Sequence, residues 1–362
     1  MGYSYQAMVT VPAPTGGPHA NITFLIKGSD PLLKLASLGT GGAIQNSTTR
    51  IYTGLTQTVP ADFVLSTDSA ISSLMSWGID FWDSTNGIIW VWVKIPSYSA
   101  GFTIYVSIGN SLITNYQGGS IGSEFSNTVA NLHLPDGSSL ALADFSGNSN
   151  SGTNHLVVAG AGKIDGAASG FNSGSAYFNL ASSSSLNITG NITISAWVFL
   201  NATTDGVIIS KATGGVDDPA YGLSVGTSFG NTNKISFQLS SAAFTTTKIS
   251  DSVNAPTGSW IHVLGTWDGS TMYLYVNGTL VNSTAFAGPI YTNTQPLQVG
   301  GDPFGAGRWF LNGLIDEICV ENAFSSADRI ATRYSNQNNP PSISAFSPIS
   351  GVGSYPMMLG IG

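Results

Sequence analysis

The stretch Met272-Tyr273-Leu274-Tyr275-Val276-Asn277-Gly278-Thr279-Leu280-Val281 decides the fold class of this chain. Aromatic and aliphatic residues fill the five positions before the Asn-Gly pair, and a second short run with apolar residues follows it. An Asn-Gly pair in this setting is typical of a two-residue hairpin loop, because a type I′ turn requires positive φ at both central residues. The stretch therefore predicts two antiparallel strands joined by a tight turn at 277–278.

Other strand-like runs extend this pattern along the chain. Clusters of Gly, Asn, Ser and Pro separate them at the spacing typical of β-sandwiches. These runs are 22–26, 88–93, 102–106 and 192–198. A helical pattern occurs at 325–334, with Ser325 as its predicted N-cap and Asp328 three residues further on. We therefore predict an all-β fold of two β-sandwich domains, with one short C-terminal helix and an extended apolar tail.

The composition narrows the classes of function. Charged residues make up 8% of the 362 residues, compared with about 25% in an average globular chain. Hydrophobic residues make up 42%, which excludes general disorder. The net charge is −8, and eleven scattered Lys and Arg residues do not form the basic surface that nucleic-acid binding requires. A surface rich in hydroxyl and amide groups is common in extracellular and virion β-proteins.

The single cysteine and the first residues bear on the compartment. Cys319 excludes an internal disulfide, and its place in Ile318-Cys319-Val320 predicts a buried, small apolar side chain. Residues 1–5 lack the pattern of a signal peptide, and no apolar run reaches the roughly 18 residues of a membrane span. We therefore expect either a chain whose signal has been removed or a virion protein that is released by lysis.

Changes in composition divide the chain into three parts. A glycine-rich stretch at 118–122 and an Asn- and Pro-rich stretch at 336–341 predict domains at 1–122 and 123–338, followed by an extended C-terminal arm at 339–362. The arm carries no charge and is too short to form its own core, so we expect it to dock on a groove or an open strand edge. Its predicted assembly contacts are Phe346, Ile349, Tyr355, Met357, Met358 and Leu359.

The surface that receives the arm can belong to the same chain or to a neighbour. Pro340-Pro341 favours an extended exit away from the preceding helix, and this favours a neighbour. We therefore expect a homo-oligomer, or attachment to another subunit of a particle.

Eight ordered segments place the second domain in a known family. They are 132–137, 143–152, 194–198, 208–211, 260–263, 265–270, 274–278 and 313–317. With the closing helix, they resemble the concanavalin A-like, laminin-G-like jelly-roll domain over about 130–335. Residues 1–125 resemble, through 79–84, 89–96 and 103–110, a domain family of unknown function that commonly precedes such jelly rolls in bacterial and archaeal surface proteins. That family has no assigned chemistry.

The jelly-roll resemblance implies a structural calcium ion. In that family a calcium often joins the first loop to the Asp of the last strand, and the matching residues here are Asp144, Asn148 and Asp316. Carboxylate and amide oxygens are ligands that Ca²⁺ prefers. The alternative is an Asx-turn at Asp144, with Asp316 hydrogen-bonded to nearby backbone amides.

The chain lacks the acids of a glycan-cleaving enzyme. Glycanases on this fold use Glu, Asp and Glu at alternating positions of one strand, whereas this strand reads Glu317-Ile318-Cys319-Val320-Glu321. Glu317 and Glu321 share a face, but their Cα atoms would lie about 13 Å apart. Retaining hydrolysis requires carboxyl groups about 5–5.5 Å apart. The four His residues are dispersed and no nucleophile elbow occurs, so we predict no catalytic residue and no enzymatic activity.

Aromatic residues in loops are candidates for sugar contact. The Trp residues of the strand-like runs fit core positions, whereas Tyr221, Phe304 and Trp309 follow or lie within Gly- and Asp-rich stretches. Loops at one end of a sandwich often carry recognition.

These observations favour a structural or adhesive protein of a virion surface. A phage tail fibre, baseplate or head-decoration subunit with a lectin-like domain for host-surface glycans fits the low charge and the apolar tail. The alternative is a secreted or cell-surface carbohydrate-binding and adhesion module of a bacterial or archaeal protein. The expected partners are other virion subunits or a second copy of the chain, with no nucleic acid and no membrane span.

Overall fold

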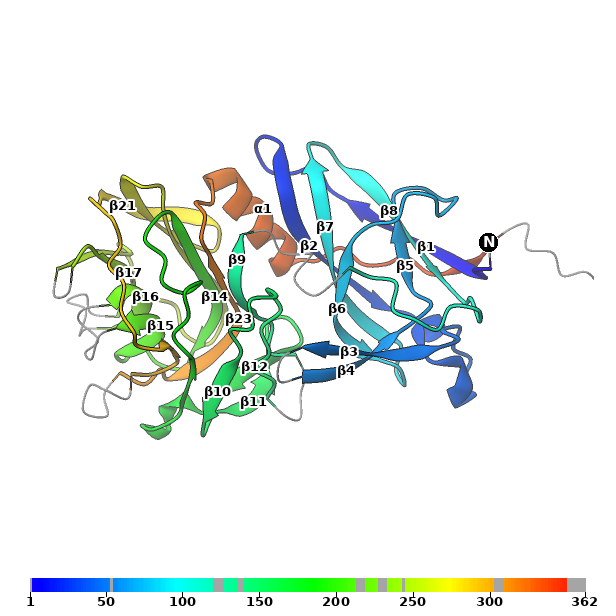
Figure 1. Cartoon of the computed structure of the whole chain (residues 1–362), viewed down its shortest axis with the longest axis horizontal. Helices are drawn as coiled ribbons and strands as arrows, with labels where there is room; N and C mark the ends of the chain where they lie inside the picture. The colour runs from blue at the N-terminus through cyan, green and yellow to red at the C-terminus, as the bar shows by residue number, and fades with distance from the viewer. Residues whose placement is uncertain are drawn as a thin grey trace, which may run out of the picture.

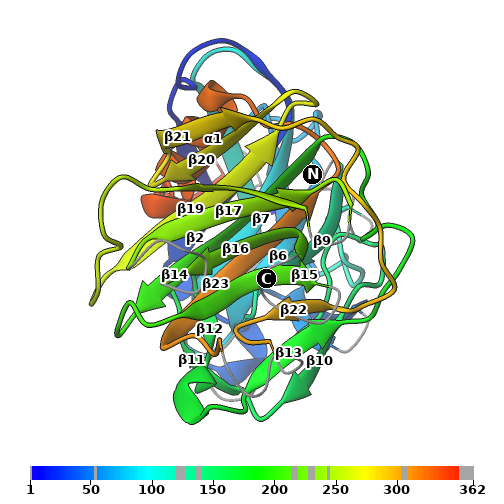
Figure 2. The ribbon, with the colours of Figure 1, turned by 90° about the vertical axis from the view of Figure 1, so that its left-hand side faces the viewer.

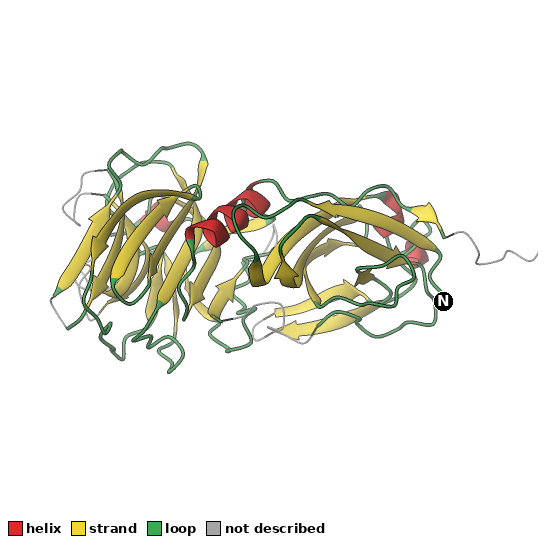
Figure 3. Cartoon of the chain, turned by 90° about the horizontal axis from the view of Figure 1, so that it is seen from above, coloured by secondary structure: helices red, strands yellow, loops and turns green. Residues whose placement is uncertain are grey.

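The computed structural model describes residues 2–52, 55–119, 127–135, 140–212, 219–226, 233–242, 245–302 and 309–349. Two groups of β-sheets lie end to end, with one α-helix, α1 (Ala327–Asn338), at their junction (Figure 1). A view from above shows the same order of sheets, helix and sheets (Figure 3). The predicted all-β architecture is confirmed, since strands make up most of the regular structure in the described part of the chain.

The N-terminal domain packs a four-stranded sheet against a three-stranded one. The order of the first is β24-β1-β8-β5, that of the second is β2-β7-β6, and β3 and β4 form a separate hairpin. Val9, Phe24, Trp77 and Ile104 are among the side chains that fill the core between these sheets. The strands are β1 (Tyr5–Val11), β2 (His19–Ser29), β3 (Ser47–Tyr52), β4 (Leu55–Pro60), β5 (Val64–Ser66), β6 (Trp77–Asp83), β7 (Ile88–Tyr98), β8 (Phe102–Ile108) and β24 (Ser347–Pro348).

The second domain is a sandwich of two larger antiparallel sheets. The seven-stranded sheet has the order β10-β13-β22-β15-β16-β17-β18. Its strands are β10 (Gly152–His155), β13 (Tyr177–Leu180), β15 (Gly206–Ala212), β16 (Pro219–Val225), β17 (Ile235–Ser240), β18 (Thr246–Ser250) and β22 (Leu297–Val299). Figure 2 looks onto the face of this sheet, with the N-terminal domain behind the jelly roll.

The eight-stranded sheet faces the N-terminal domain. Its order is β11-β12-β23-β14-β19-β20-β21, and β9 pairs with β23 beside this path. Its strands are β9 (Thr128–Leu132), β11 (Val158–Ala161), β12 (Gly166–Ser169), β14 (Ile192–Leu200), β19 (Trp260–Trp267), β20 (Thr271–Val276), β21 (Thr279–Ala285) and β23 (Gly313–Glu321). Short 3₁₀ turns occur at Pro31–Leu33, Ala36–Leu38 and Phe171–Ser173.

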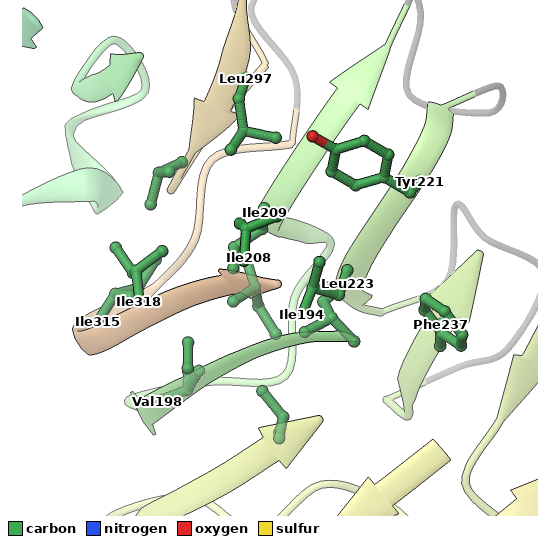
Figure 4. Close-up of a cluster of buried hydrophobic side chains, with 14 of the residues drawn as sticks. Ile194, Val198, Ile208, Ile209, Tyr221, Leu223, Phe237, Leu297, Ile315 and Ile318 are labelled. Atoms are coloured by element: carbon green, nitrogen blue, oxygen red, sulfur yellow. The ribbon is translucent and has the colours of Figure 1, made fainter. Parts of the chain in front are cut away.

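Alternating side chains from both sheets form the jelly-roll core. Ile194 and Val198 of β14 point toward Ile209, Leu223 and other side chains of the opposite sheet (Figure 4). Burying one such aliphatic side chain contributes roughly 1.5–3 kcal/mol. Because successive side chains of a strand point to opposite faces, the outward-facing positions of the same strands can carry polar residues.

The predicted hairpin and helix are present, with one change at the helix. Strands β20 and β21 are joined at Asn277 and Gly278, whose φ values are 50° and 73°. The helix begins one residue later than predicted, because the Oγ of Ser326, not of Ser325, accepts the Arg329 backbone N–H. The Ser325 N–H instead donates to Thr193 Oγ1. The helix also continues to Asn338, just before the proline pair.

The first part of the C-terminal arm docks on its own chain. The Lys27 N–H donates to the Pro341 carbonyl, the Ile343 N–H donates to the Lys27 carbonyl, and β24 pairs with β1. Ile343 lies within the N-terminal core and Phe346 packs against it, while Ile349 donates its N–H to the Ser4 carbonyl. The expectation of a neighbour's groove is therefore wrong for 341–349. Tyr355, Met357, Met358 and Leu359 lie outside the described residues.

The two domains are also joined by side-chain contacts. The end of hairpin strand β3 carries Tyr52, whose ring lies 4.2 Å from that of Phe145 in the jelly roll. Helix α1 lies against β2, where Arg329 donates to the carbonyls of Ala20 and Asn21. No helix in the described ranges is long and apolar enough to cross a membrane.

Candidate ligand-binding face

A row of polar side chains crosses the outer face of the seven-stranded sheet. Directly paired residues of neighbouring antiparallel strands point to the same face, so the strand register defines the row. Core side chains of the same strands, such as Leu223 and Phe237, point the opposite way. We call this set the polar row. Its members, in strand order, are Thr153, Asn179, Gln298, Ser210, Gly222, Gln238 and Lys248.

A second set of hydroxyls runs beside the polar row. Ser224 pairs with Ser236, and Ser236 with Ser250, whose hydroxyl oxygens lie 2.6 Å apart. The face that these strands turn away from the core therefore offers amide and hydroxyl groups from neighbouring strands.

Two members of this face keep unused hydrogen-bonding capacity. Gln298 is 2% exposed, yet neither its Nε2 nor its Oε1 has a hydrogen-bond partner among the described residues. The Oγ of Ser224 is also buried and has no hydrogen-bond partner among the described residues. Leaving a buried polar group unsatisfied costs about 1–3 kcal/mol. Buried polar groups without a partner are rare in folded proteins, so these two require an explanation.

Trp309 adds an aromatic side chain to the same face. Its half-buried side chain packs against Val207, and its carbonyl accepts the Val207 N–H at 2.9 Å. Val207 is paired with Ser224, so the indole lies next to the hydroxyl set. The φ of Trp309 is 82°, a left-handed conformation that is uncommon for a bulky residue. Of the three predicted sugar contacts, Trp309 is the one that the structure places at this surface.

The prediction that Tyr221 lies in a loop is wrong. Tyr221 belongs to β16, is 1% exposed, and donates its hydroxyl hydrogen to the Leu186 carbonyl at 2.9 Å. Its ring points into the core beside Ile209 and Leu223, so it has no free face for a sugar (Figure 4). Phe304 lies outside the described residues.

The loop that begins at Asp144, to which the family resemblance assigns a calcium ion, has the hydrogen bonds of an Asx-turn. Asp144 Oδ1 accepts the N–H groups of Asn131 and Ser146, and its Oδ2 accepts the Ser146 hydroxyl and the Asn150 N–H. Asn148 donates its amide to the Thr128 carbonyl. Four donors already occupy the Asp144 carboxylate, so these residues do not fit the implied ion.

Asp316 is held by a different part of the chain. Its Oδ2 accepts the backbone N–H groups of Lys163 and Ile164, each at 2.9 Å. The carboxylates of Asp144 and Asp316 are thus positioned by separate sets of backbone amides, as the Asx-turn alternative states.

The two acids considered for glycan cleavage lie beneath the N-terminal domain. Glu317 and Glu321 line one small cavity together with Cys319, which agrees with their predicted common face. Glu317 accepts a hydrogen bond from His133 at 2.8 Å, and Glu321 forms an ion pair with Arg333 at 2.6 Å. Each acid is thus engaged with a neighbouring side chain beneath the N-terminal domain.

Comparison with known proteins supports the jelly-roll assignment. Residues 172–331, less than half of the chain, match the profile of the Concanavalin A-like lectin/glucanases superfamily. The N-terminal resemblance stays a prediction. No curated protein has a significantly similar sequence.

Solved structures with a similar fold include binding domains of bacterial proteins. The binding domain of Paraclostridial Mosquitocidal Protein 1 is 16% identical, with a TM-score of 0.44 over 57% of this chain and 52% of that one. Domain 4 of AbnA, an extracellular arabinanase from Geobacillus stearothermophilus solved with arabinotriose, is 18% identical, with a TM-score of 0.44 over 57% and 97%. The receptor binding domain of botulinum neurotoxin C/D mosaic serotype is 16% identical, with a TM-score of 0.45 over 58% and 51%. The chain thus spans about half the length of both toxin domains.

Proposed function

We propose that this chain is a non-enzymatic adhesion protein whose jelly roll binds a glycan on the outer face of its seven-stranded sheet. Amide and hydroxyl groups are suitable partners for sugar hydroxyls, and an indole provides an apolar surface for a sugar ring. The observation that carries the proposal is the unpartnered amide of Gln298 on the face where Trp309 stands half-buried.

The absence of enzymatic activity is part of the same proposal. It is supported by the engagement of Glu317 with His133 and of Glu321 with Arg333 beneath the other domain. The polar row itself contains no carboxylate.

We place the protein on a virion surface, where it would contact host glycans and other virion subunits or a second copy of itself. The support is the low fraction of charged residues, 8%, together with a surface of hydroxyls and amides. Purified particles of the virus that encodes the chain should then carry it. Its recovery with bacterial or archaeal cell walls would indicate the alternative, a cell-surface module.

Glycan binding is tested with the full chain on a glycan array, followed by calorimetry with the best ligand. We expect Trp309→Ala to weaken binding at least tenfold and Gln298→Leu to weaken it as well. Gln298→Leu should also raise the melting temperature, because it removes two unsatisfied polar atoms.

The matched control is Trp260→Ala. Trp260 is also half-buried, but it packs on Phe199 at the outer face of the other sheet, with ring centroids 5.8 Å apart. Equal binding by Trp309→Ala and the unchanged chain would contradict the proposed face, and a failure of all glycans to bind would contradict the function.

A further inference from the structure

Three ionisable side chains from both domains converge at the junction. They are Asp80 of β6, His133 just after β9, and Glu317 of β23. One nitrogen or oxygen atom from each lies within 4.8 Å of the others. All three are buried, and Asp80 is only 1% exposed. We call this group the junction cluster.

Two irregularities in the strands aim these acids at one another. The pairing of β6 with β7 shifts between Ile79 and Phe81, which leaves Asp80 as the extra residue. The pairing of β23 with β14 shifts in the same way around Glu317, whose φ is 52°. Bulges of this kind change the direction in which a side chain points.

The bulge in β23 has a second effect on the acids. Ile315 and Ile318 both enter the jelly-roll core, although residues three apart in a regular strand point to opposite faces. Asp316 and Glu317, which lie between them, are therefore both left outside that core. Asp316 is not a member of the junction cluster, and its Oδ2 is held by the backbone N–H groups of Lys163 and Ile164.

Each of these carboxylates keeps at least one unused oxygen. Among the described residues, no donor reaches Oδ1 or Oδ2 of Asp80, Oε1 of Glu317, or Oδ1 of Asp316. The second oxygens of Asp316 and Glu317 are anchored, by the backbone of residues 163–164 and by His133. Within the junction cluster, both carboxylate oxygens of Asp80 and Oε1 of Glu317 are therefore available to a ligand.

The histidine orients the cluster. The Asn131 amide nitrogen lies 2.9 Å from His133 Nε2, and as a donor it leaves Nδ1 to carry the proton. That proton points at Glu317 Oε2, 2.8 Å away. The imidazole is fixed between Trp92, stacked at 4.8 Å, and Phe145, edge-on at 4.7 Å. Both ring nitrogens are occupied, so His133 is a positioning residue and the free ligand atoms are all oxygens.

The junction cluster brings two carboxyl groups together with one imidazole, and all three side chains are buried.

The basic side chains near the junction are engaged with other groups. Arg333 is paired with Glu321, Lys163 donates to Asn338, and Arg329 donates to two carbonyls of β2. Several buried carboxylates without a cation are costly, and a bound cation removes that cost.

We propose that the junction cluster binds one divalent cation, with Asp80 and Glu317 as ligands and His133 as the positioning residue, and that this ion fastens the N-terminal domain to the jelly roll. Oxygen-only ligands select a hard cation, and Ca²⁺ suits them better than Mg²⁺ because it accepts six to eight oxygens in flexible geometry. Neither ligand belongs to the calcium site that the family resemblance implies.

The test uses the full chain after chelation, followed by addition of CaCl₂, MgCl₂ or MnCl₂. We expect one Ca²⁺ per chain by elemental analysis and calorimetry. Calcium at about 100 times its dissociation constant should raise the melting temperature by roughly 5 °C or more. Asp80→Asn should abolish this rise, even if the chelated variant is itself more stable than the chelated parent. His133→Gln should lower the calcium affinity about 10–100-fold.

The matched control is Asp144→Asn, in which the carboxylate of the first jelly-roll loop is altered and the junction cluster is intact. This variant should keep the calcium-dependent rise. A rise that persists in Asp80→Asn but disappears in Asp144→Asn would overturn the proposal in favour of the loop. Failure of all three cations to bind would also overturn it, and would mean that the acids share protons instead.

Discussion

The side-chain amide of Asn336 makes both hydrogen bonds of a strand neighbour to Leu25. Its Oδ1 accepts the Leu25 N–H at 2.7 Å, and its Nδ2 donates to the Leu25 carbonyl at 2.8 Å. Asn336 lies on α1, and the next residue, Gln337, accepts the indole N–H of Trp197 in the jelly roll at 2.8 Å. Two adjacent side chains of one helix therefore bond to both domains.

Asn336→Ala should destabilise the protein. The change leaves a buried N–H and a buried carbonyl of Leu25 without partners, at about 1–3 kcal/mol for each group. Chemical denaturation should show a loss of roughly 2–4 kcal/mol. Ser335→Ala, at an exposed neighbouring position of the helix, is the control and should have little effect. Equal stability of both variants would mean that water replaces the amide.

The buried ion pair between Glu321 and Arg333 predicts a non-additive double variant. Arg333→Leu leaves the Glu321 carboxylate buried without its partner and should cost about 3–5 kcal/mol. Adding Glu321→Leu removes that charge, so the double variant should recover most of the loss. Unfolding free energies of the three variants, measured by urea titration, test this. A double variant with the summed loss of the singles would contradict the explanation.

His262 should make stability depend on acidity. Burial, with a further contribution from the charge of Arg333, lowers its pKa to about 3, whereas an unfolded histidine titrates near about 6.5. Between these values the unfolded state binds more protons than the folded state. The stability contributed by neutral His262 is therefore complete above the unfolded pKa and is lost as the pH falls from 6.5 toward 3, by at most about 1.4 kcal/mol per pH unit.

The comparison that isolates this effect is His262→Phe. The ring of His262 lies edge-on to Trp197 at 5.3 Å, and phenylalanine preserves a ring there without a titrating group. Other acids and bases titrate in both proteins, so the difference between their unfolding free energies reports His262. That difference should shift in favour of the variant as the pH is lowered. A difference that is constant from pH 7 to pH 4 would refute the assignment.

Ile343 should stabilise the N-terminal domain of its own chain. It is 9% exposed, and its Cδ1 lies near the position that a side chain at Gly28 would occupy. Ile343→Ala should cost about 2–5 kcal/mol by opening a cavity. The mass in solution should stay the same, because the contact is internal. A change of oligomeric state would instead show that the arm also acts on a neighbour.

Local signals were read correctly from the sequence, whereas contacts between distant segments were not. The turn at Asn277 and Gly278 depends on backbone conformations that those two residues favour. The Gly- and Asp-rich stretch before Tyr221 indicates a loop, but Pro219 begins β16, and proline is compatible with the first residue of a strand. The partner of the tail was misassigned because strand addition has the same geometry within a chain and between chains.

The junction cluster was missed for a similar reason. Asp80 stands in the apolar run Ile79-Asp80-Phe81-Trp82, and nothing in that run reveals the bulge that turns its side chain outward. An acid within an otherwise apolar strand, together with the adjacent pair Asp316-Glu317, is the signal that could have drawn attention to it. The polar row was also hidden, since it depends on the register of seven strands.

The pairing of β24 with β1 makes the jelly roll an insertion within the N-terminal domain. The polypeptide passes from the N-terminal domain to the jelly roll between β8 and β9 and returns after α1. A single proteolytic nick in one of these passages leaves an intact covalent link at the other, and the contacts between the two domains remain. After one cleavage the two fragments should therefore stay associated in the folded protein and separate only on denaturation. Two cuts are needed before the domains can part.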